Sequence, residues 1–219
     1  MEEDERYREE RESMLELQLQ WRGIHDSRVL DAMRRVPRHL FVPPDLRSRA
    51  YQDGPLPIGL GQTISQPYIV AAMTEMLELK GHENVFEVGT GSGYQAAVLG
   101  ELAGAVHTVE RHPELASRAG EVLTRLGYNN VFVHTDDGTL GWLPGAPYQA
   151  IVVTAAAPRI STAWTEQMEE GATLVVPVGG QGEQHLERWR KTNGCMVCEI
   201  LFPVAFVPLR GRYGWQEYS

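Results

Sequence analysis

Cysteine and positive charge are both scarce in this 219-residue chain. Its two cysteines, Cys195 and Cys198, form one C-x-x-C, and no second cysteine pair exists to complete a zinc site. Because the motif lies in a strand-like run and not at a helix start, we expect reduced thiols and no bound metal. Lysine and arginine total 20 against 29 acids, a formal net charge of −9. That balance argues against nucleic acid or an anionic membrane as a partner.

Long apolar runs are also missing. Residues 1–13 are almost wholly charged or polar, so they provide no apolar core for a signal peptide, and no stretch approaches the length of a membrane span. We therefore expect a soluble, cytoplasmic protein. The hydrophobic content of 42% suffices for one well-buried domain over 1–219. Within it we expect N-terminal helices and an active-site loop over 1–80, and a ligand-binding sheet core over 81–219.

The most informative segment runs from Asn84 to Glu110 and reads N-V-F-E-V-G-T-G-S-G-Y-Q-A-A-V-L-G-E-L-A-G-A-V-H-T-V-E. An apolar strand leads into Gly89, Gly91 and Gly93, then a helix, then a second strand, which is the outline of a nucleoside-binding βαβ unit. Glycines there let the backbone turn sharply and approach a ligand closely. Glu110 ends the second strand, where an acid can bind both hydroxyls of a ribose.

Several ligands compete for this turn. A dinucleotide fold would have G-x-G-x-x-G, but Tyr94 stands where its third glycine would be, which weakens the case for NAD or FAD. A triphosphate-binding G-x-x-x-x-G-K-[ST] is absent, and no lysine lies between Lys80 and Lys191. S-adenosylmethionine remains, and Glu87 at the end of the first strand suits its ammonium group or a water beside it. The glycines could also form a tight turn with no ligand.

Strand and helix patterns alternate after residue 81, which predicts a parallel sheet with helices on both faces. The pattern then changes, because two apolar runs are joined by Thr192-Asn193-Gly194, and Asn-Gly between such runs predicts a hairpin. The predicted fold class is therefore α/β, a Rossmann-like class I methyltransferase with a mostly parallel twisted sheet, a C-terminal antiparallel hairpin and an N-terminal helical appendage. We expect strands at 85–88, 106–109, 131–134, 150–153, 173–178, 185–191 and 195–206.

Helices are predicted up to Trp21, from 27 to Pro37, over 67–79, from 94 and over 113–126. The stretch 41–67 is rich in Pro and Gly, and we expect an irregular, functional loop there. Arginines cluster at 34, 35, 38, 47 and 49, either as a solvated helix face or as an attraction for a carboxylate-bearing substrate.

Ser65 is the candidate acceptor-binding residue from this loop. It lies just before a helix, where backbone N–H groups and hydroxyls can bind an anion such as a carboxylate. Its alternative role is a helix N-cap before Pro67. On the other side of the site, 154–158 reads T-A-A-A-P. Alanines there cannot hold an exocyclic amine, which disfavours amine methylation.

Taken together, these residues resemble the protein-L-isoaspartate (D-aspartate) O-methyltransferases. The resemblance spans 23–209, and its most specific part is T-I-S-Q-P at 63–67 combined with E-V-G-T-G-S-G-Y at 87–94. Further matches are V-P-R at 36–38, F-V at 41–42, L-P-I-G at 56–59, V-E-R at 109–111, D-G at 137–138, V-T-A-A at 153–156 and F-V-P-L at 206–209.

The resemblance implies methyl transfer from S-adenosyl-L-methionine, with S-adenosyl-L-homocysteine as product. The acceptor would be the free α-carboxylate of L-isoaspartyl and D-aspartyl residues in damaged proteins and peptides, a repair activity; we expect a monomer. Ser65 matches the active-site serine, and Asp137 would accept a hydrogen bond from the adenine amino group. By resemblance, Thr63, Ile64 and Ser65 contact substrate, while Glu87, Gly89, Thr90, Gly91, Ser92, Gly93, Glu110, Arg111, Asp137 and Gly138 contact the cofactor.

The sequence departs from the family pattern at two places. Asp136 stands where a glycine is usual, and Arg210 stands where a small or polar residue is common. The tail 210–219 has no counterpart in the resemblance. Two alternatives stay open: a carboxyl methyltransferase of the same fold with a dedicated peptide partner, and a non-catalytic module that retains the cofactor pocket.

Overall fold

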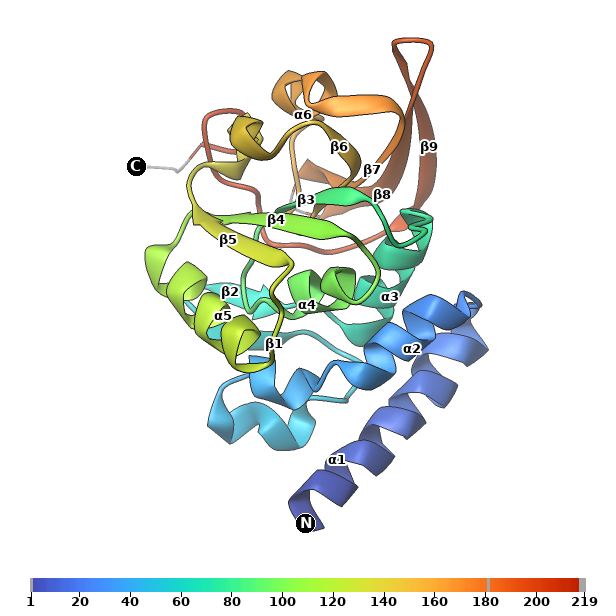
Figure 1. Cartoon of the computed structure of the whole chain (residues 1–219), viewed down its shortest axis with the longest axis vertical. Coiled ribbons are helices and arrows are strands. Elements are labelled where there is room, and N and C mark those ends of the chain that lie inside the picture. Colours follow the sequence, from blue (N-terminus) through green and yellow to red (C-terminus); the bar gives the residue numbers. More distant parts are fainter. Residues whose placement is uncertain (1, 181, 217–219) are drawn as a thin grey trace.

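A twisted seven-stranded sheet forms the centre of the computed structural model, which describes residues 2–180 and 182–216 (Figure 1). The strand order is β5-β4-β3-β6-β7-β8-β9, and the first five of these strands are parallel. β7, β8 and β9 follow one another as an antiparallel meander, so the predicted fold class and C-terminal hairpin are confirmed. The strands are β3 (Asn84–Val88), β4 (Ala105–Glu110), β5 (Val131–Thr135), β6 (Tyr148–Val153), β7 (Met168–Gly180), β8 (Glu183–Thr192) and β9 (Cys195–Pro203).

The two faces of the sheet are covered unequally. Val85 on β3 packs into a large apolar cluster, to which α2 through α5 all contribute. Its neighbours Phe86 and Val88 point the opposite way, into a smaller cluster with Trp164 of α6. Helices therefore cover both faces, as predicted, but the second face has one short helix supplemented by irregular chain. The helices are α2 (Ser27–Arg35), α3 (Pro67–Met76), α4 (Tyr94–Gly100), α5 (Pro113–Arg125) and α6 (Thr162–Glu166).

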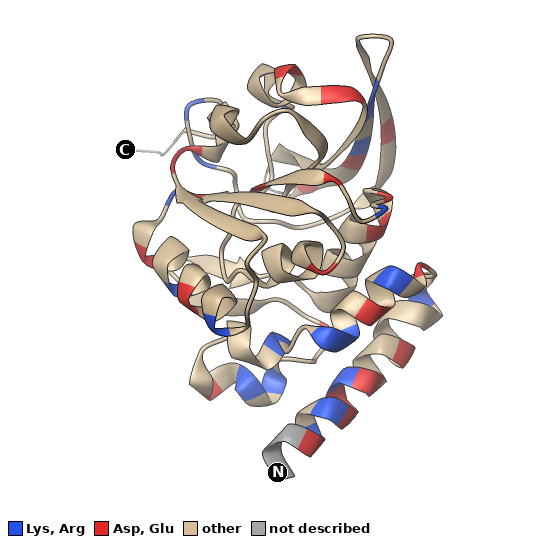
Figure 2. Ribbon diagram, viewed as in Figure 1, with Lys and Arg blue, Asp and Glu red and all other residues tan. Residues whose placement is uncertain are grey.

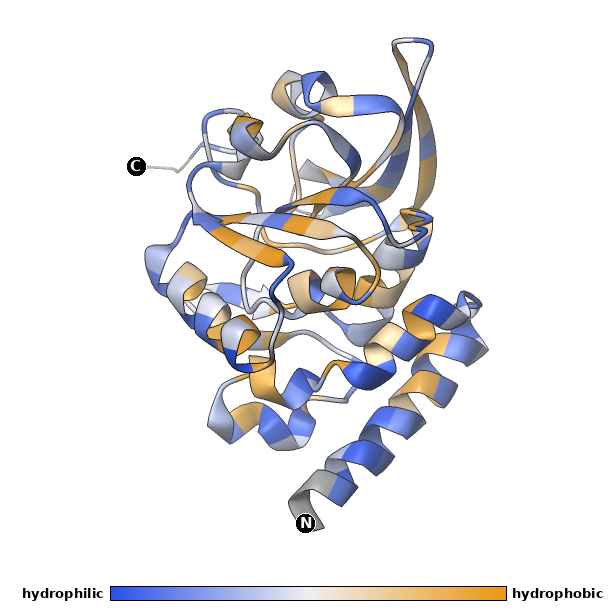
Figure 3. Ribbon diagram, viewed as in Figure 1, coloured by the Kyte–Doolittle hydropathy of each residue, from blue (hydrophilic) through white to orange (hydrophobic). Residues whose placement is uncertain are grey.

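The N-terminal segment is a long helical arm lying along α2 (Figure 1). It begins as α1 (Glu2–Ser13), widens to a π-helix over Met14–Leu19 and tightens to a 3₁₀ turn over Gln20–Arg22. Both charge signs line the arm (Figure 2), which is hydrophilic over most of its length (Figure 3). Its sparse apolar positions, Tyr7, Met14, Leu15 and Leu19, are buried, whereas Trp21 is 76% exposed. Gly23, at φ 93°, ends the arm just beyond the predicted helix end at Trp21.

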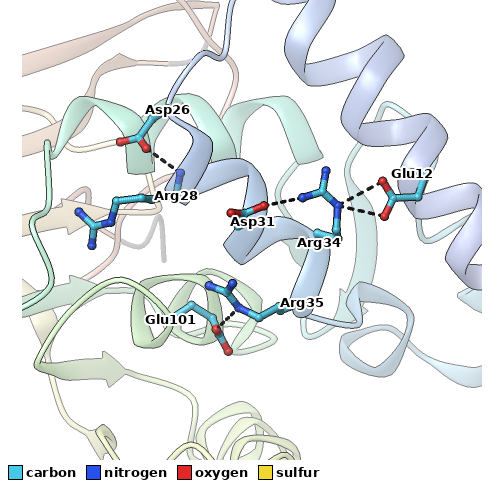
Figure 4. Close-up of polar contacts among 7 residues, drawn as sticks. All are labelled: Glu12, Asp26, Arg28, Asp31, Arg34, Arg35 and Glu101. Carbon is cyan, nitrogen blue, oxygen red and sulfur yellow. Dashed lines mark hydrogen bonds and ion pairs between the residues drawn. The ribbon is translucent and has the colours of Figure 1, made fainter.

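Ion pairs tie α2 to its neighbours (Figure 4). Asp26 caps the helix by accepting a hydrogen bond from the Arg28 amide at 2.8 Å. Arg34 reaches Glu12 of α1 at 3.1 Å, and Arg35 reaches Glu101 beyond α4 at 2.6 Å. These pairs are exposed, so each contributes at most about 1 kcal/mol to stability. The prediction of a solvated arginine face holds for Arg34 and Arg35.

The predicted irregular loop contains more order than the sequence suggested. It holds two 3₁₀ segments, Arg38–Phe41 and Pro44–Arg49, followed by β1 (Leu56–Gly59) and β2 (Gln62–Ile64), which pair as a small antiparallel hairpin. The hairpin turns at Leu60 and Gly61, both at positive φ. It was missed because Leu rarely adopts that conformation and Leu-Gly is no hairpin signal.

Shorter 3₁₀ turns at Gly138–Leu140 and Leu143–Gly145 connect β5 to β6. Across the described ranges, no helix combines the length and apolar character needed to cross a membrane. The strand order reverses between β3 and β6. In sheets of this kind a ligand binds outside the carboxyl ends of the strands at that point.

Candidate cofactor and acceptor site

The turn between β3 and α4 requires its glycines. Gly89, Gly91 and Gly93 have φ values of 95°, 53° and 86°, a region that disfavours other residues. A Cβ on Gly89 would lie 2.5 Å from the Thr154 hydroxyl, and one on Gly93 would lie 3.1 Å from the Cβ of Ala119. The turn is therefore pressed against β6 and α5, so tight packing explains these glycines as well as ligand approach does.

Glu110 joins this turn to the start of α5. Its side chain is nearly buried, and its two carboxylate oxygens accept hydrogen bonds from the backbone amides of Gly91 at 2.9 Å and His112 at 3.0 Å. Each oxygen retains a second lone pair. Because Glu110 also lines the adjoining cavity, it can hold the turn and accept two further hydrogen bonds, as binding of two ribose hydroxyls requires.

One cavity at the carboxyl ends of β3, β4 and β6 brings most of the predicted residues together. The predicted residues lining it are Thr63, Ile64, Ser65, Gly89, Thr90, Gly91, Ser92, Glu110, Arg111 and Gly138. Glu87, Gly93 and Asp137 are not among its lining residues. The sequence analysis placed the segment 154–158 at the site, and Thr154 and Ala155 line the cavity. It did not assign the segment 207–210, which also lines the cavity; the signal for Val207, Pro208 and Leu209 was their place in the family resemblance.

Glu87 lies beneath the glycine turn. Its carboxyl group is fully buried and has no hydrogen-bond partner in the described part of the chain. Loss of hydration raises the pKa of Glu87 to about 8; the nearby Thr108 hydroxyl opposes the shift, and the charge of Glu110 adds to it. The Thr108 hydroxyl forms its own short hydrogen bond, 2.6 Å, with the Thr90 hydroxyl. Glu87 is therefore neutral at pH 7, with unsatisfied oxygens that a cationic group or a water could pair.

Asp137 is held by its own turn and by the C-terminal segment. One carboxylate oxygen accepts bonds from the Thr139 amide and hydroxyl, at 2.9 and 2.6 Å, and the other accepts from the Arg212 amide at 2.7 Å. Gly138 allows close packing, since a Cβ there would lie 2.8 Å from Val88. The unusual Asp136 is exposed and accepts a bond from the Asp137 amide at 2.7 Å.

The described part of the tail packs beside this end of the cavity. Arg210 lines the cavity itself. Trp215 donates from its indole N–H to the Ala156 carbonyl at 3.0 Å, and the Tyr213 amide donates to the Thr139 hydroxyl at 3.1 Å. Of the tail 210–219, Arg210 therefore lines the cavity, and Arg212 and Tyr213 pack beside it against Asp137 and Thr139.

Ser65 is not a helix cap. α3 begins at Pro67, its N-cap residue is Gln66, and no side chain caps it, so the capping alternative is wrong. The Ser65 hydroxyl forms no hydrogen bond with any described residue, and Ser65 lines the same cavity as the glycine turn. Its backbone carbonyl accepts a bond from Arg38 at 2.8 Å. The hydroxyl is therefore available to a ligand at the cofactor mouth.

A groove of about 480 Å³ opens from the same place. Thr63, Ser65, Thr154 and Val207 line both the groove and the cavity, so the two are continuous. The far wall is largely apolar and includes Tyr68 and Phe202, whose ring centroids are 6.5 Å apart. Arg22 lies over the Tyr68 ring at 3.6 Å and pairs with Asp53 at 3.0 Å. The cofactor cavity, which has charged and polar residues in its lining, therefore opens into a groove whose far wall is largely apolar.

Comparisons with known proteins agree on one family. The family model for protein-L-isoaspartate(D-aspartate) O-methyltransferase (PCMT) matches residues 9–214. A protein-L-isoaspartate O-methyltransferase of Methanoculleus marisnigri is 56% identical over 209 residues, 95% of each chain. A solved protein-L-isoaspartate O-methyltransferase has a TM-score of 0.84 and 28% identity, covering 93% of this chain and 67% of that one. A Plasmodium falciparum protein assigned to the same enzyme, solved with S-adenosyl-L-homocysteine, has the same fold, with a TM-score of 0.80, 24% identity and coverage of 91% and 98%.

Proposed function

This chain belongs to the protein-L-isoaspartate(D-aspartate) O-methyltransferase family, and on that premise we propose that it methylates the free α-carboxylate of L-isoaspartyl and D-aspartyl residues in damaged proteins and peptides. S-adenosyl-L-methionine is the methyl donor. The observation that carries the proposal is the shared lining of the cofactor cavity and the open groove by Thr63, Ser65, Thr154 and Val207. Donor and acceptor can meet there.

The residues of the cavity suit this cofactor. Glu110 offers two carboxylate oxygens of a nearly buried side chain to the ribose hydroxyls. Glu87 offers an unpaired, buried carboxyl group beneath the turn, where an ammonium group or a bridging water would complete its hydrogen bonding. The ammonium group or water would reach Glu87 from the glycine turn, so Glu87 can bind it without lining the cavity. Asp137, held by three hydrogen bonds, presents a fixed carboxylate beside Gly138 for the adenine amino group.

The acceptor needs little chemical activation. The α-carboxyl group of an isoaspartyl residue has a pKa of about 3.5, so it is ionised at neutral pH and needs no general base. When bound, S-adenosyl-L-methionine supplies an electrophilic methyl group. The protein has only to align the carboxylate with the methyl group. The Ser65 hydroxyl and the loop amides around it orient the carboxylate. Such positioning can contribute roughly 7 to 11 kcal/mol in favourable cases.

The groove is suited to the peptide that carries the acceptor. It is open, bordered by Tyr68 and Phe202 on one side, and ends at the unbonded Ser65 hydroxyl. An extended chain lying in it would bring its branching carboxylate to the cavity mouth. Without further help from the enzyme, the backbone amide nitrogen that follows the ester attacks its carbonyl and expels methanol to give a succinimide. Addition of water to the succinimide returns some normal aspartate, which completes repair.

The deciding experiment is methyl transfer from labelled S-adenosyl-L-methionine to an isoaspartyl peptide and to its aspartyl twin. We expect incorporation into the isoaspartyl peptide only, across peptides of unrelated flanking sequence. Transfer restricted to one flanking sequence would instead favour the alternative of a carboxyl methyltransferase with a dedicated peptide partner. Cofactor binding by calorimetry with no transfer to any peptide would favour a non-catalytic module.

We also propose that the enzyme acts as a monomer in the cytoplasm. Sedimentation of the active enzyme at assay concentration tests the first part. A dimer that loses activity on dilution would contradict it.

A further inference from the structure

Arg38 is an unusual buried cation. The sequence placed it in a surface arginine cluster, but its side chain is fully buried, which corrects that expectation. Its Nε donates to the Ala50 carbonyl at 2.7 Å and its Nη2 donates to the Ser65 carbonyl at 2.8 Å. Its Nη1 has no hydrogen-bond partner among the described residues. One side chain therefore fixes two separate points of the 38–66 loop, and one of them is Ser65.

The guanidinium of Arg38 also lies over an aromatic ring on the cofactor side of the site. Its central carbon lies 4.8 Å from the centroid of the Tyr94 ring. Tyr94 directly follows Gly93, begins α4 and lines the cofactor cavity. Phe41 packs against the same ring in an edge-to-face arrangement, at a centroid distance of 5.6 Å. Arg38 is thus in contact with both halves of the site, the acceptor loop and the glycine turn.

Arg38 is costly to bury in comparison with an ordinary packing residue. No acidic side chain in the described ranges forms an ion pair with Arg38, and burial lowers its pKa only to about 10, so it remains charged at neutral pH. A buried charge without a counter-charge is costly, and an apolar side chain of similar volume would fill the space more cheaply. What the apolar side chain cannot supply is a rigid fork that donates to two carbonyls at once.

We propose that Arg38 is a positioning residue for methyl transfer, holding the Ser65 loop in register with the glycine turn so that the acceptor carboxylate meets the cofactor in line. It acts through the Ser65 carbonyl, with Tyr94 as the surface against which its guanidinium packs, and does not contact the reacting atoms. Its buried positive charge also lies behind the loop that receives an anionic acceptor. The proposal rests on the proposed function only for the identity of the acceptor.

The test compares Arg38→Met and Arg38→Lys with a matched control, Arg28→Met. Arg28 also donates to two backbone carbonyls, those of Leu79 and Leu102, but away from the site. Activity is expressed per cofactor-binding site, counted by calorimetric titration, so that unfolded protein is excluded. We expect all three variants to melt earlier, and cofactor affinity to stay within about twofold of wild type. For both Arg38 variants kcat/KM for an isoaspartyl peptide should fall by up to about 100-fold, whereas Arg28→Met leaves it unchanged.

A double variant identifies the route of the effect. If Arg38 acts by placing Ser65, then Arg38→Met combined with Ser65→Ala should be little slower than Ser65→Ala alone, because residues that act as a unit are non-additive. Multiplicative losses would overturn the proposal, as would Arg38 and Arg28 variants with equal activity per binding site. Lack of any turnover by the wild-type enzyme would instead count against the proposed function, since the Arg38 comparison is a ratio to wild type.

Discussion

Replacing Glu87 by Gln tests the buried acid beneath the glycine turn. In the unfolded chain a glutamate titrates near its ordinary value of 4.5, whereas burial raises the pKa of Glu87 to about 8 in the folded protein. The folded state therefore binds the proton more tightly. The native protein is most stable, with respect to this group, at pH values below 4.5, and it loses stability progressively as the pH rises toward 8.

The magnitude follows from the two pKa values. Each pH unit between them costs about 1.4 kcal/mol, so between pH 5 and pH 7.5 the wild-type protein should lose about 3 kcal/mol of unfolding free energy through this group. Glutamine has the same shape and does not titrate in this range. The difference in unfolding free energy between Glu87→Gln and wild type should therefore grow in favour of the variant by about 3 kcal/mol over that interval.

Urea denaturation of both proteins at the two pH values measures this change in the difference of unfolding free energies. Any cost of burying the glutamine amide that does not depend on pH cancels in the comparison. The same variant should bind S-adenosyl-L-methionine more weakly, because it lacks a carboxylate for the ammonium group. Wild-type binding at pH 7 should release close to one proton, visible as a dependence of the calorimetric enthalpy on buffer ionisation, and the variant should release none from this position. A stability difference that is the same at both pH values would refute the assignment of a protonated, buried Glu87.

Three further substitutions address the rest of the site. Ser65→Ala should lower kcat by roughly tenfold to 100-fold with cofactor affinity unchanged; equal losses in both would point to a purely structural serine. Glu110→Ala removes two charge-assisted hydrogen bonds and should weaken cofactor binding on the order of 100-fold in a direct titration, and unchanged affinity would exclude it from the ribose site. Tyr68→Ser should raise KM by about fivefold for isoaspartyl peptides with an aromatic neighbour and leave glycine-flanked peptides unaffected, whereas equal effects on both would remove the groove from acceptor binding.

Much of this molecule could be predicted from local patterns. The alternation of strand and helix patterns predicted the parallel strands, and Asn193-Gly194 predicted the final hairpin. Three glycines followed by Glu110 predicted the cofactor turn. In each case the signal is contained in a few neighbouring residues, because turn torsions and strand faces are set locally.

What escaped prediction depends on contacts between distant residues. Nothing near Arg38 in the sequence distinguishes it from the exposed Arg34 and Arg35, since its burial arises from the fold of a loop ending 27 positions later at Ser65. The bond between Asp137 and Arg212 spans 75 positions. The hairpin of β1 and β2 needs Leu60 at positive φ, a conformation that local propensity opposes.

The open groove beside Ser65 affects which damaged residues the enzyme can reach. An open surface groove receives a stretch of chain only if that stretch can be drawn away from its own protein, so altered residues in mobile segments and frayed ends are reached first. Altered aspartates buried in a stably folded region would be methylated only after that region unfolds locally. The rate of repair would thereby report local unfolding in the damaged protein.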